Sequence, residues 1–202
     1  NDTVGNTGTN VTTTTNSSTV TVDQTSPTIS SITMTSNNAT NTLGKLGDVI
    51  TLSFTSSETI NTPTVIFTDS ESDDLSTTVN SVGNNWTATR TIIAGDDDGL
   101  VTFVISNISD IAGNTASNVT AVSSGSNITI DQTLPTLTPI SISTDYTITT
   151  EARIGNIIPL TFTASETITP TVVIKDYQSN VLSTDSLTND GNNWTATHTV
   201  DE

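Results

Sequence analysis

The sequence predicts an all-β protein built from successive β-sandwiches, and three observations support this prediction. A unit with a period of 108 residues is repeated: DQTSPTI at 23–29 returns as DQTLPTL at 131–137, and GNNWTAT at 83–89 returns at 191–197. Short alternating runs of apolar and polar residues recur with turn signals about every 8 to 12 residues, and no amphipathic helix interrupts them. Roughly a third of the residues are Ser or Thr, which suit the solvent-exposed face of a sheet.

Each repeat is expected to be a domain, because a unit of this length can bury its own core. We expect residues 1–22 to be the last strand of a preceding repeat, 23–130 a complete domain, and 131–202 a second domain truncated before its last two strands. A disordered Thr-rich linker is the alternative for residues 1–22. A sandwich without its last strands exposes unpaired edges, so a second alternative is that a neighbouring copy lends residues 1–22 as a donor strand.

Seven short strands are predicted in the complete repeat. They cover residues 28–36, 49–56, 63–69, 75–81, 86–93, 100–106 and 128–130. The tetrapeptide VGNN at 82–85 is typical of a tight hairpin, since Gly and Asn tolerate positive φ. This number and spacing of strands predict tandem sandwiches of the immunoglobulin-like type. The cysteine pair of antibody domains is absent.

Five motifs occur in order along the repeat. Three of them return 108 residues later, one with a single change, and a fourth, GDVI, returns as GNII. The five motifs are D-x-T-x-P at 23–27, GDVI at 47–50, FTSSETI at 54–60, GNNWTAT at 83–89 and D-x-A-G-N at 110–114. This series resembles the bacterial Ig-like repeats of giant surface adhesins, and related repeats occur in prokaryotic S-layer and filament proteins. The resemblance covers nearly the whole chain and implies the fold. It leaves the function open, because such repeats serve as stalks, spacers and binding tips.

The charge balance excludes several classes of partner. The formal net charge is −17, with only four Lys and Arg residues. Such a surface repels nucleic acid and anionic lipid but attracts divalent cations. No apolar run reaches the roughly 18 residues of a membrane-spanning helix, and the lack of Cys rules out disulfides and thiolate metal sites. We therefore expect neither nucleic-acid binding nor membrane insertion in this stretch.

Carboxylates are expected to gather at the two ends of each sandwich. In this topology Asp23, Glu58 and Asp110 fall at the end where the chain enters the first domain. Asp96 and Asp98, within the run DDD at 96–98, fall at the other end, where we expect them to approach Asp131 and Glu166 of the next repeat. Ca²⁺ takes six to eight oxygen ligands in flexible geometry, and the resemblance implies calcium-stiffened junctions. The alternative is that GDDDG is an ordinary solvated turn.

Signals for catalysis are weak. The single histidine, His198, corresponds to Arg90 of the first repeat, which predicts an exposed strand position that requires polarity alone. The chain has neither G-x-S-x-G nor H-E-x-x-H.

The acidic run DSESDD at 69–74 lacks the Gly and the final Glu of an EF-hand, which favours a solvated loop. Trp86 and Trp194 occupy the same repeat position and are predicted to pack at the core rather than to bind sugars.

These observations favour a non-catalytic module of a large extracellular or cell-surface protein. Its partners would be adjacent repeats of the same polypeptide, and its task would be to extend and stiffen that protein with Ca²⁺. One alternative is a cell-adhesion module that binds a glycan or a protein. Another is a subunit of an S-layer or filament assembled from copies of the chain by strand exchange.

Overall fold

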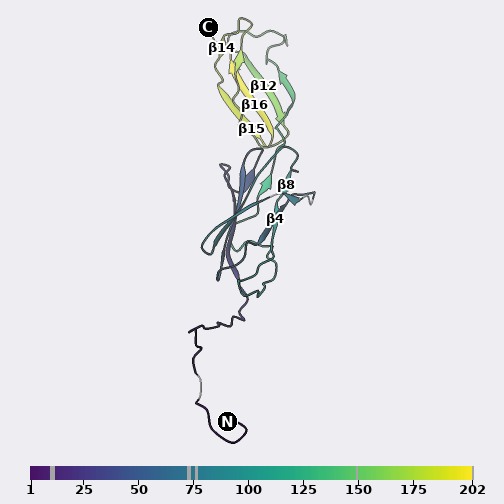
Figure 1. Ribbon diagram of the computed structural model, residues 1–202. Helices are drawn as coiled ribbons and strands as arrows, with labels where there is room; N and C mark the ends of the chain where they lie inside the picture. The colour runs from purple at the N-terminus through teal and green to yellow at the C-terminus, as the bar shows by residue number, and fades with distance from the viewer. Residues whose placement is uncertain (10–11, 72–73, 76, 149, 202) are drawn as a thin grey trace. The chain divides into compact units, whose positions relative to one another are not determined.

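The computed structural model describes residues 1–9, 12–71, 74–75, 77–148 and 150–201, and every regular element in these ranges is a β-strand. The prediction of an all-β fold is therefore confirmed. The chain divides into two compact units, Asn1–Gln132 and Thr133–Glu202 (Figure 1). None of the described segments forms a helix of the length and apolarity that a membrane crossing would need.

Four antiparallel strands form one sheet of the first unit. Their order is β1 (Ile29–Ser36), β3 (Val49–Ser56), β7 (Asn85–Thr91) and β6 (Thr78–Val82). The β3 sequence VITLSFTS alternates strictly, so every second side chain is buried. A tight turn at Gly83 joins β6 to β7, with φ of 60° at this glycine.

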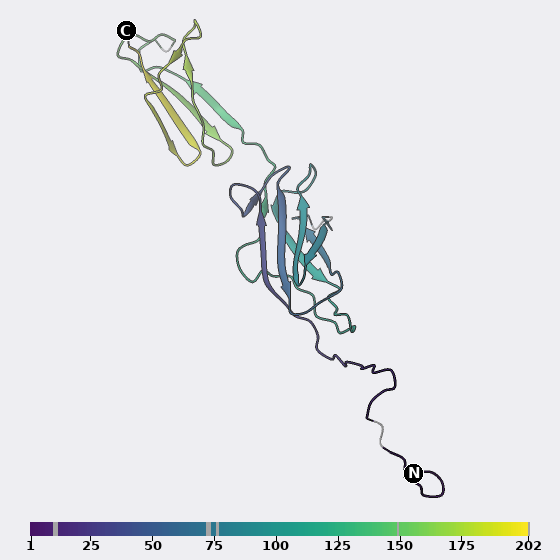
Figure 2. The same ribbon diagram turned by 60° about the vertical axis from the view of Figure 1, so that its left-hand side comes forward.

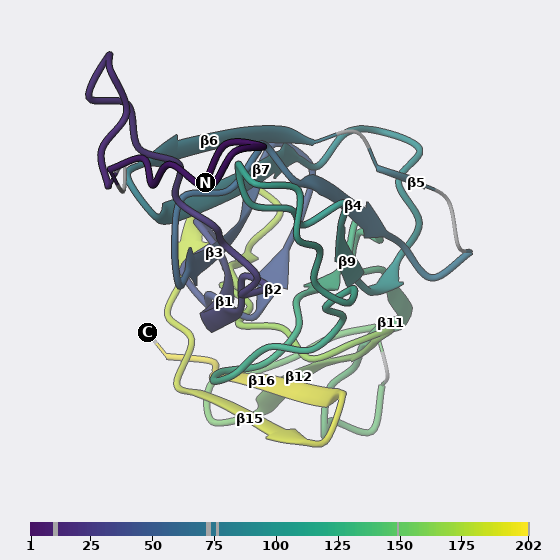
Figure 3. The same ribbon diagram turned by 60° about the horizontal axis from the view of Figure 1, so that its bottom comes forward.

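Two three-stranded sheets face this sheet. In one, β4 (Thr64–Thr68) lies between β5 (Asp74–Leu75) and β9 (Thr102–Ser106). In the other, β10 (Thr129–Ile130) runs parallel to β2 (Leu43–Gly44) and antiparallel to β8 (Gly99–Leu100). Figure 3 shows β3, β7 and β6 on one side of the unit and β4, β9 and β5 on the other.

A single hydrophobic core lies between these layers. The four-stranded sheet and the facing strands both contribute buried side chains, among them Ile50, Leu52, Phe54, Phe67, Phe103, Ile105, Ile128 and Ile130. Because both layers bury one face against the other, the first unit is a β-sandwich.

The second unit repeats the four-stranded sheet. The order is β11 (Leu137–Ile142), β12 (Ile157–Ala164), β16 (Asn193–Thr199) and β15 (Ser186–Asp190), the same as in the first unit (Figure 2).

The registers of the two sheets correspond as well. Phe54 lies opposite Trp86, and Phe162 lies opposite Trp194. Both pairs stack with ring centroids 6.3 Å apart, at interplanar angles of 7° and 8°. The sequence repeat is therefore also a structural repeat, and the tryptophans pack as predicted.

One close contact of the first core limits the size of a neighbouring residue. A Cβ atom added to Gly44 would lie 2.5 Å from Ile92 Cδ1, so a larger residue at position 44 would require Ile92 to shift.

The strands agree closely with those predicted, apart from short additions. Only β3 keeps its predicted limits of 49–56, whereas the other predicted strands shift at their ends. The two-residue strand β2 lies where a loop was expected, and the predicted strand at 100–106 divides into the end of β8 and the longer β9. Among residues 1–9 and 12–22 the structure has no strand, so pairing of this segment with a partner remains a prediction.

Candidate cation site

Three carboxylates of the first unit lie close together. Asp23 precedes β1, Glu58 follows β3 and Asp110 follows β9, and one oxygen from each lies within 4.8 Å of the other two. Within the described part of the chain, this is the only group of three acidic or histidine side chains so placed. The structure thus brings together the three residues predicted at this end of the sandwich.

Two loops are held together by hydrogen bonds so that Glu58 and Asp110 meet. Asn61, which follows the strand-bridge residue Ile60, donates its backbone N–H to Ser109 O at 2.9 Å. Its side-chain Nδ2 donates to Asp110 O, also at 2.9 Å. The loop after β3 and the loop after β9 therefore form one surface.

The Asp110 carboxylate is almost fully buried, at 1% exposure, and organises its own loop. Its Oδ1 accepts the N–H groups of Gly113 at 2.6 Å and Asn114 at 2.8 Å, and its Oδ2 accepts Asn114 Nδ2 at 2.8 Å. Gly113 has φ of 98°, a conformation that favours glycine. The side-chain hydrogen bond from Asn114 is the main reason that the pKa of Asp110 is lowered.

Asn114 also ties Asp23 to the site, because its Nδ2 donates to the backbone oxygen of Asp23 at 3.3 Å. Glu58 is half-buried, and this burial is the main reason that the pKa of its carboxyl is raised. The negative charges of Asp23 and Asp110 raise the pKa further. Like charges held together in this way favour either a proton or a cation.

The donor set fits a hard cation. All three groups offer carboxylate oxygens, and the cluster includes neither His nor Cys. Ca²⁺ and Mg²⁺ prefer oxygen ligands, whereas Zn²⁺ sites in proteins are built mostly from nitrogen and sulfur. Asp23 is exposed, so water can complete the coordination of an ion.

The acids predicted at the other end have protein partners. Asp96 Oδ1 accepts a hydrogen bond from Arg90 Nη2 at 2.5 Å, and its Oδ2 accepts Ile93 N at 2.9 Å. Asp98 Oδ1 accepts Gln132 N at 2.6 Å. The turn is therefore organised by hydrogen bonds rather than freely solvated.

The predicted approach of Asp96, Asp98 and Asp131 to Glu166 stays a prediction, because the three aspartates belong to the first unit and Glu166 to the second. In the acidic run at 69–74, Ser72 and Asp73 lie outside the described residues. Asp69 itself is buried, at 5% exposure, and accepts the N–H of Asp97 at 3.3 Å. At this residue the run is packed rather than solvated.

The expectation that Arg90 and His198 mark an exposed position is wrong. The Arg90 side chain is 11% exposed, and His198 is 2% exposed with its Nδ1 2.8 Å from Ser183 O. Side chains on a strand alternate between faces, so the buried Trp86 and Ala88 already place Arg90 on the inner face. The two-residue alternation of this strand was therefore the sequence signal that could have predicted the buried position of Arg90.

Replacement of Glu58 by glutamine is expected to stabilise the cation-free protein at pH 7. The folded state raises the pKa of Glu58, so its ionised form opposes folding above that pKa. The advantage of Glu58→Gln should shrink as the pH falls toward 4.5, the ordinary pKa of this group, because the parent then takes up a proton on folding. Urea unfolding in chelator at several pH values measures this. A variant less stable than the parent at pH 7 would contradict it.

No protein-family model matches the chain, and no curated protein shows significant similarity to it.

Proposed function

We propose that this protein is a non-catalytic repeat module that extends and stiffens a larger extracellular or cell-surface protein, with Ca²⁺ as the stiffening ion. The observation that carries the proposal is the recurrence of one strand order and one register in both units. Tandem copies of one sandwich add length to a polypeptide without requiring a different site in each copy.

The role of Ca²⁺ rests on the position of Asp23. This residue lies in the segment that leads into β1, whereas Glu58 and Asp110 lie on loops of the sandwich. An ion shared by the three carboxylates would connect the incoming segment to the sandwich and offset their repulsion. Removal of the ion would leave like charges facing one another and free the segment to move.

Kinship with the Ig-like repeats of bacterial surface adhesins is part of the proposal. It rests on the five sequence motifs, two of which have a structural counterpart. The D-x-A-G-N motif forms the Asp110 turn, and the GNNWTAT motif forms the β6–β7 hairpin and the stacked Trp86.

Calorimetric titration with Ca²⁺ tests the proposal. The chain is expected to bind Ca²⁺, and Glu58→Gln is expected to weaken the binding about tenfold or more, because fewer charged ligands lower the affinity of calcium sites. Glu71→Gln removes an exposed glutamate outside the group and serves as the matched control. Equal binding by the parent and Glu58→Gln, or no binding by either, would refute the calcium part of the proposal.

A further inference from the structure

The four-stranded sheet of the first unit has two edges that differ. At the edge formed by β1, the register against β3 shifts between Ser30 and Thr33, and Ser31 has φ of 53°. Ser123 covers this irregular stretch, because its Oγ accepts the N–H of Ile32 and its own N–H donates to Ile32 O, both at 2.8 Å. An irregular register and a covering loop are two devices by which proteins prevent other strands from pairing at a sheet edge.

The opposite edge, formed by β6, has neither device among the described residues. Its register against β7 is unbroken from the pair Thr78–Thr89 to the pair Val82–Asn85. Within the described part of the chain, no backbone hydrogen bond to a segment other than β7 involves residues 78–82, and β6 ends the strand order (Figure 3). The sequence TTVNSVGNN at 77–85 contains neither a charged residue nor proline. Such residues usually discourage pairing at an edge.

The turn of the β6–β7 hairpin determines which backbone groups face outward. Val82 and Asn85 flank a two-residue turn whose first residue, Gly83, has φ of 60°. In such a hairpin the two flanking residues exchange hydrogen bonds, and hydrogen-bonded pairs then alternate along the strands. The N–H and C=O groups of Val79 and Ser81 therefore point away from β7, toward the open edge.

The sheet face beside this edge is uncharged as well. Alternate residues of a strand point to opposite faces, and the buried residues of β3 and β7 identify the inner face. The outward positions of β3, β6 and β7 are Val49, Thr51, Ser53, Thr55, Thr78, Asn80, Val82, Asn85, Thr87, Thr89 and Thr91. Two copies of a chain with net charge −17 repel one another. This face and edge allow a second copy to approach without bringing carboxylates together.

The corresponding strand of the second unit is different. β15 ends at Asp190, and Asp185 directly precedes it. Asp185 is held beside the sheet, because its Oδ2 accepts the N–H of Thr199 at 2.6 Å. Pairing of β15 between two copies would bring two carboxylates from each copy to one short edge, which opposes association. Of the two equivalent strands, β6 is therefore the one suited to pairing.

We propose that β6 pairs with β6 of a second copy of this chain, in antiparallel orientation about a two-fold axis. A strand paired with itself in this way places Asn80 opposite Asn80 of the second copy, and Thr78 opposite Val82. Val79 of each copy exchanges main-chain hydrogen bonds with Ser81 of the other. The interface is β-augmentation between identical strands, and it joins two four-stranded sheets into one continuous sheet. Because both copies use the same surface, the product is a closed dimer.

The contact is small, which sets the strength of association that we expect. Five residues from each copy form one pair of strands, and this buries less than the roughly 1,200 Å² of a stable interface. Association should therefore be weak and should grow with the concentration of chains. The pairing is independent of the cation site, because Asp23, Glu58 and Asp110 lie outside β6.

Cysteine variants test the pairing and its register, because the chain has no native cysteine. Asn80→Cys is expected to form a disulfide-linked dimer, since residues that face each other at a non-hydrogen-bonded position have Cα atoms about 4.5 Å apart. Thr78→Cys is the matched control on the same strand and face. In this register its counterpart lies four residues away along the strand, about 13 Å, so its yield of dimer should be at least about tenfold lower.

A mixture of two variants checks the register from the other side. Thr78→Cys chains and Val82→Cys chains should each cross-link poorly alone and should form a mixed disulfide when combined. Equal dimer yields for Asn80→Cys and Thr78→Cys would overturn the register. Absence of a disulfide from Asn80→Cys under oxidising conditions would overturn the pairing itself.

Sedimentation over a range of concentrations tests the association without a disulfide. The parent is expected to dimerise, and Asn80→Asp and Asn80→Lys are each expected to weaken the dimer about two- to fivefold, because like charges then lie directly opposite each other. A mixture of the two variants should restore association. Thr35→Asp adds a charge at an exposed position on the β1 edge and should behave like the parent. A parent that stays monomeric at every concentration, or an equal loss in Thr35→Asp, would refute self-pairing through β6.

Discussion

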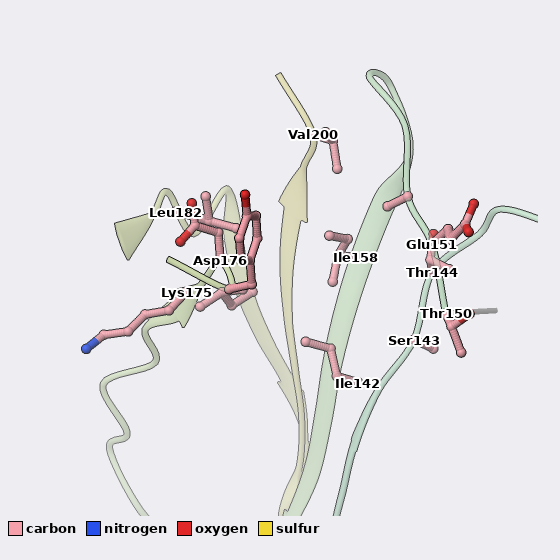
Figure 4. Close-up of a pocket in the computed structure, with 13 residues that line it drawn as sticks. Ile142, Ser143, Thr144, Thr150, Glu151, Ile158, Lys175, Asp176, Leu182 and Val200 are labelled. Atoms are coloured by element: carbon pink, nitrogen blue, oxygen red, sulfur yellow. The ribbon is translucent and has the colours of Figure 1, made fainter. Parts of the chain in front are cut away.

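Replacement of Ile50 by alanine is expected to destabilise the first unit by about 2 to 5 kcal/mol, the usual cost of such a change in a closed core. Ile50 is 0% exposed in the centre of β3. The same change at Ile158, its counterpart in the second unit, is expected to cost about 1 kcal/mol. Ile158 is half-buried and lines an open pocket together with Ile142, Leu182 and Val200 (Figure 4), so less apolar area returns to water.

Each unit contains one tryptophan, and this allows the two effects to be measured separately. Urea unfolding followed by fluorescence in a Trp194→Phe background reports the first unit, and a Trp86→Phe background reports the second. Val82→Ala, at a position 83% exposed, should change stability by less than about 0.5 kcal/mol. Equal costs at Ile50 and Ile158 would mean that the second core is as closed as the first.

Replacement of Asp96 by alanine is expected to destabilise the first unit by about 3 to 5 kcal/mol, because it leaves the Arg90 guanidinium buried without its counter-charge. The two side chains are 5% and 11% exposed. Asp96 also accepts Ile93 N, and Arg90 Nε has no hydrogen-bond partner among the residues that the structure describes, so the guanidinium depends strongly on this carboxylate.

A double variant separates the ion pair from the turn. Arg90→Leu/Asp96→Ala is expected to recover much of the lost stability, since replacing a buried ion pair by apolar side chains is often close to neutral. The measurement is urea unfolding of the four members of the cycle. A cost below about 0.5 kcal/mol for Asp96→Ala, or one that appears only when Ca²⁺ is added, would show that Asp96 serves as a cation ligand instead.

The sequence was sufficient to predict the all-β fold and the positions of the long strands. The regular alternation of β3 and the glycine of the β6–β7 turn are local signals, and local signals locate strands well. The grouping of Asp23, Glu58 and Asp110 followed from the expected topology, which placed three loops at one end of the sandwich.

Other features depended on contacts that the sequence does not display. The strands β2 and β8 contain two residues each, which is too short for a periodic pattern. The ion pair between Asp96 and Arg90 was not predicted, because the charge of Arg90 suggested an exposed position. The alternation of buried and exposed residues along β7 indicates the opposite. The hydrogen bond from Gln132 to Asp98 joins residues 34 positions apart.

The mobility of the segment before Asp23 tests the central claim most directly. A nitroxide on Thr21→Cys can be followed by electron paramagnetic resonance at a concentration where the chain is monomeric. We predict that Ca²⁺ slows the label, that a chelator restores its motion, and that Glu58→Gln removes the difference. A spectrum that Ca²⁺ leaves unchanged in the parent would contradict the claim that a cation at Asp23, Glu58 and Asp110 stiffens this protein.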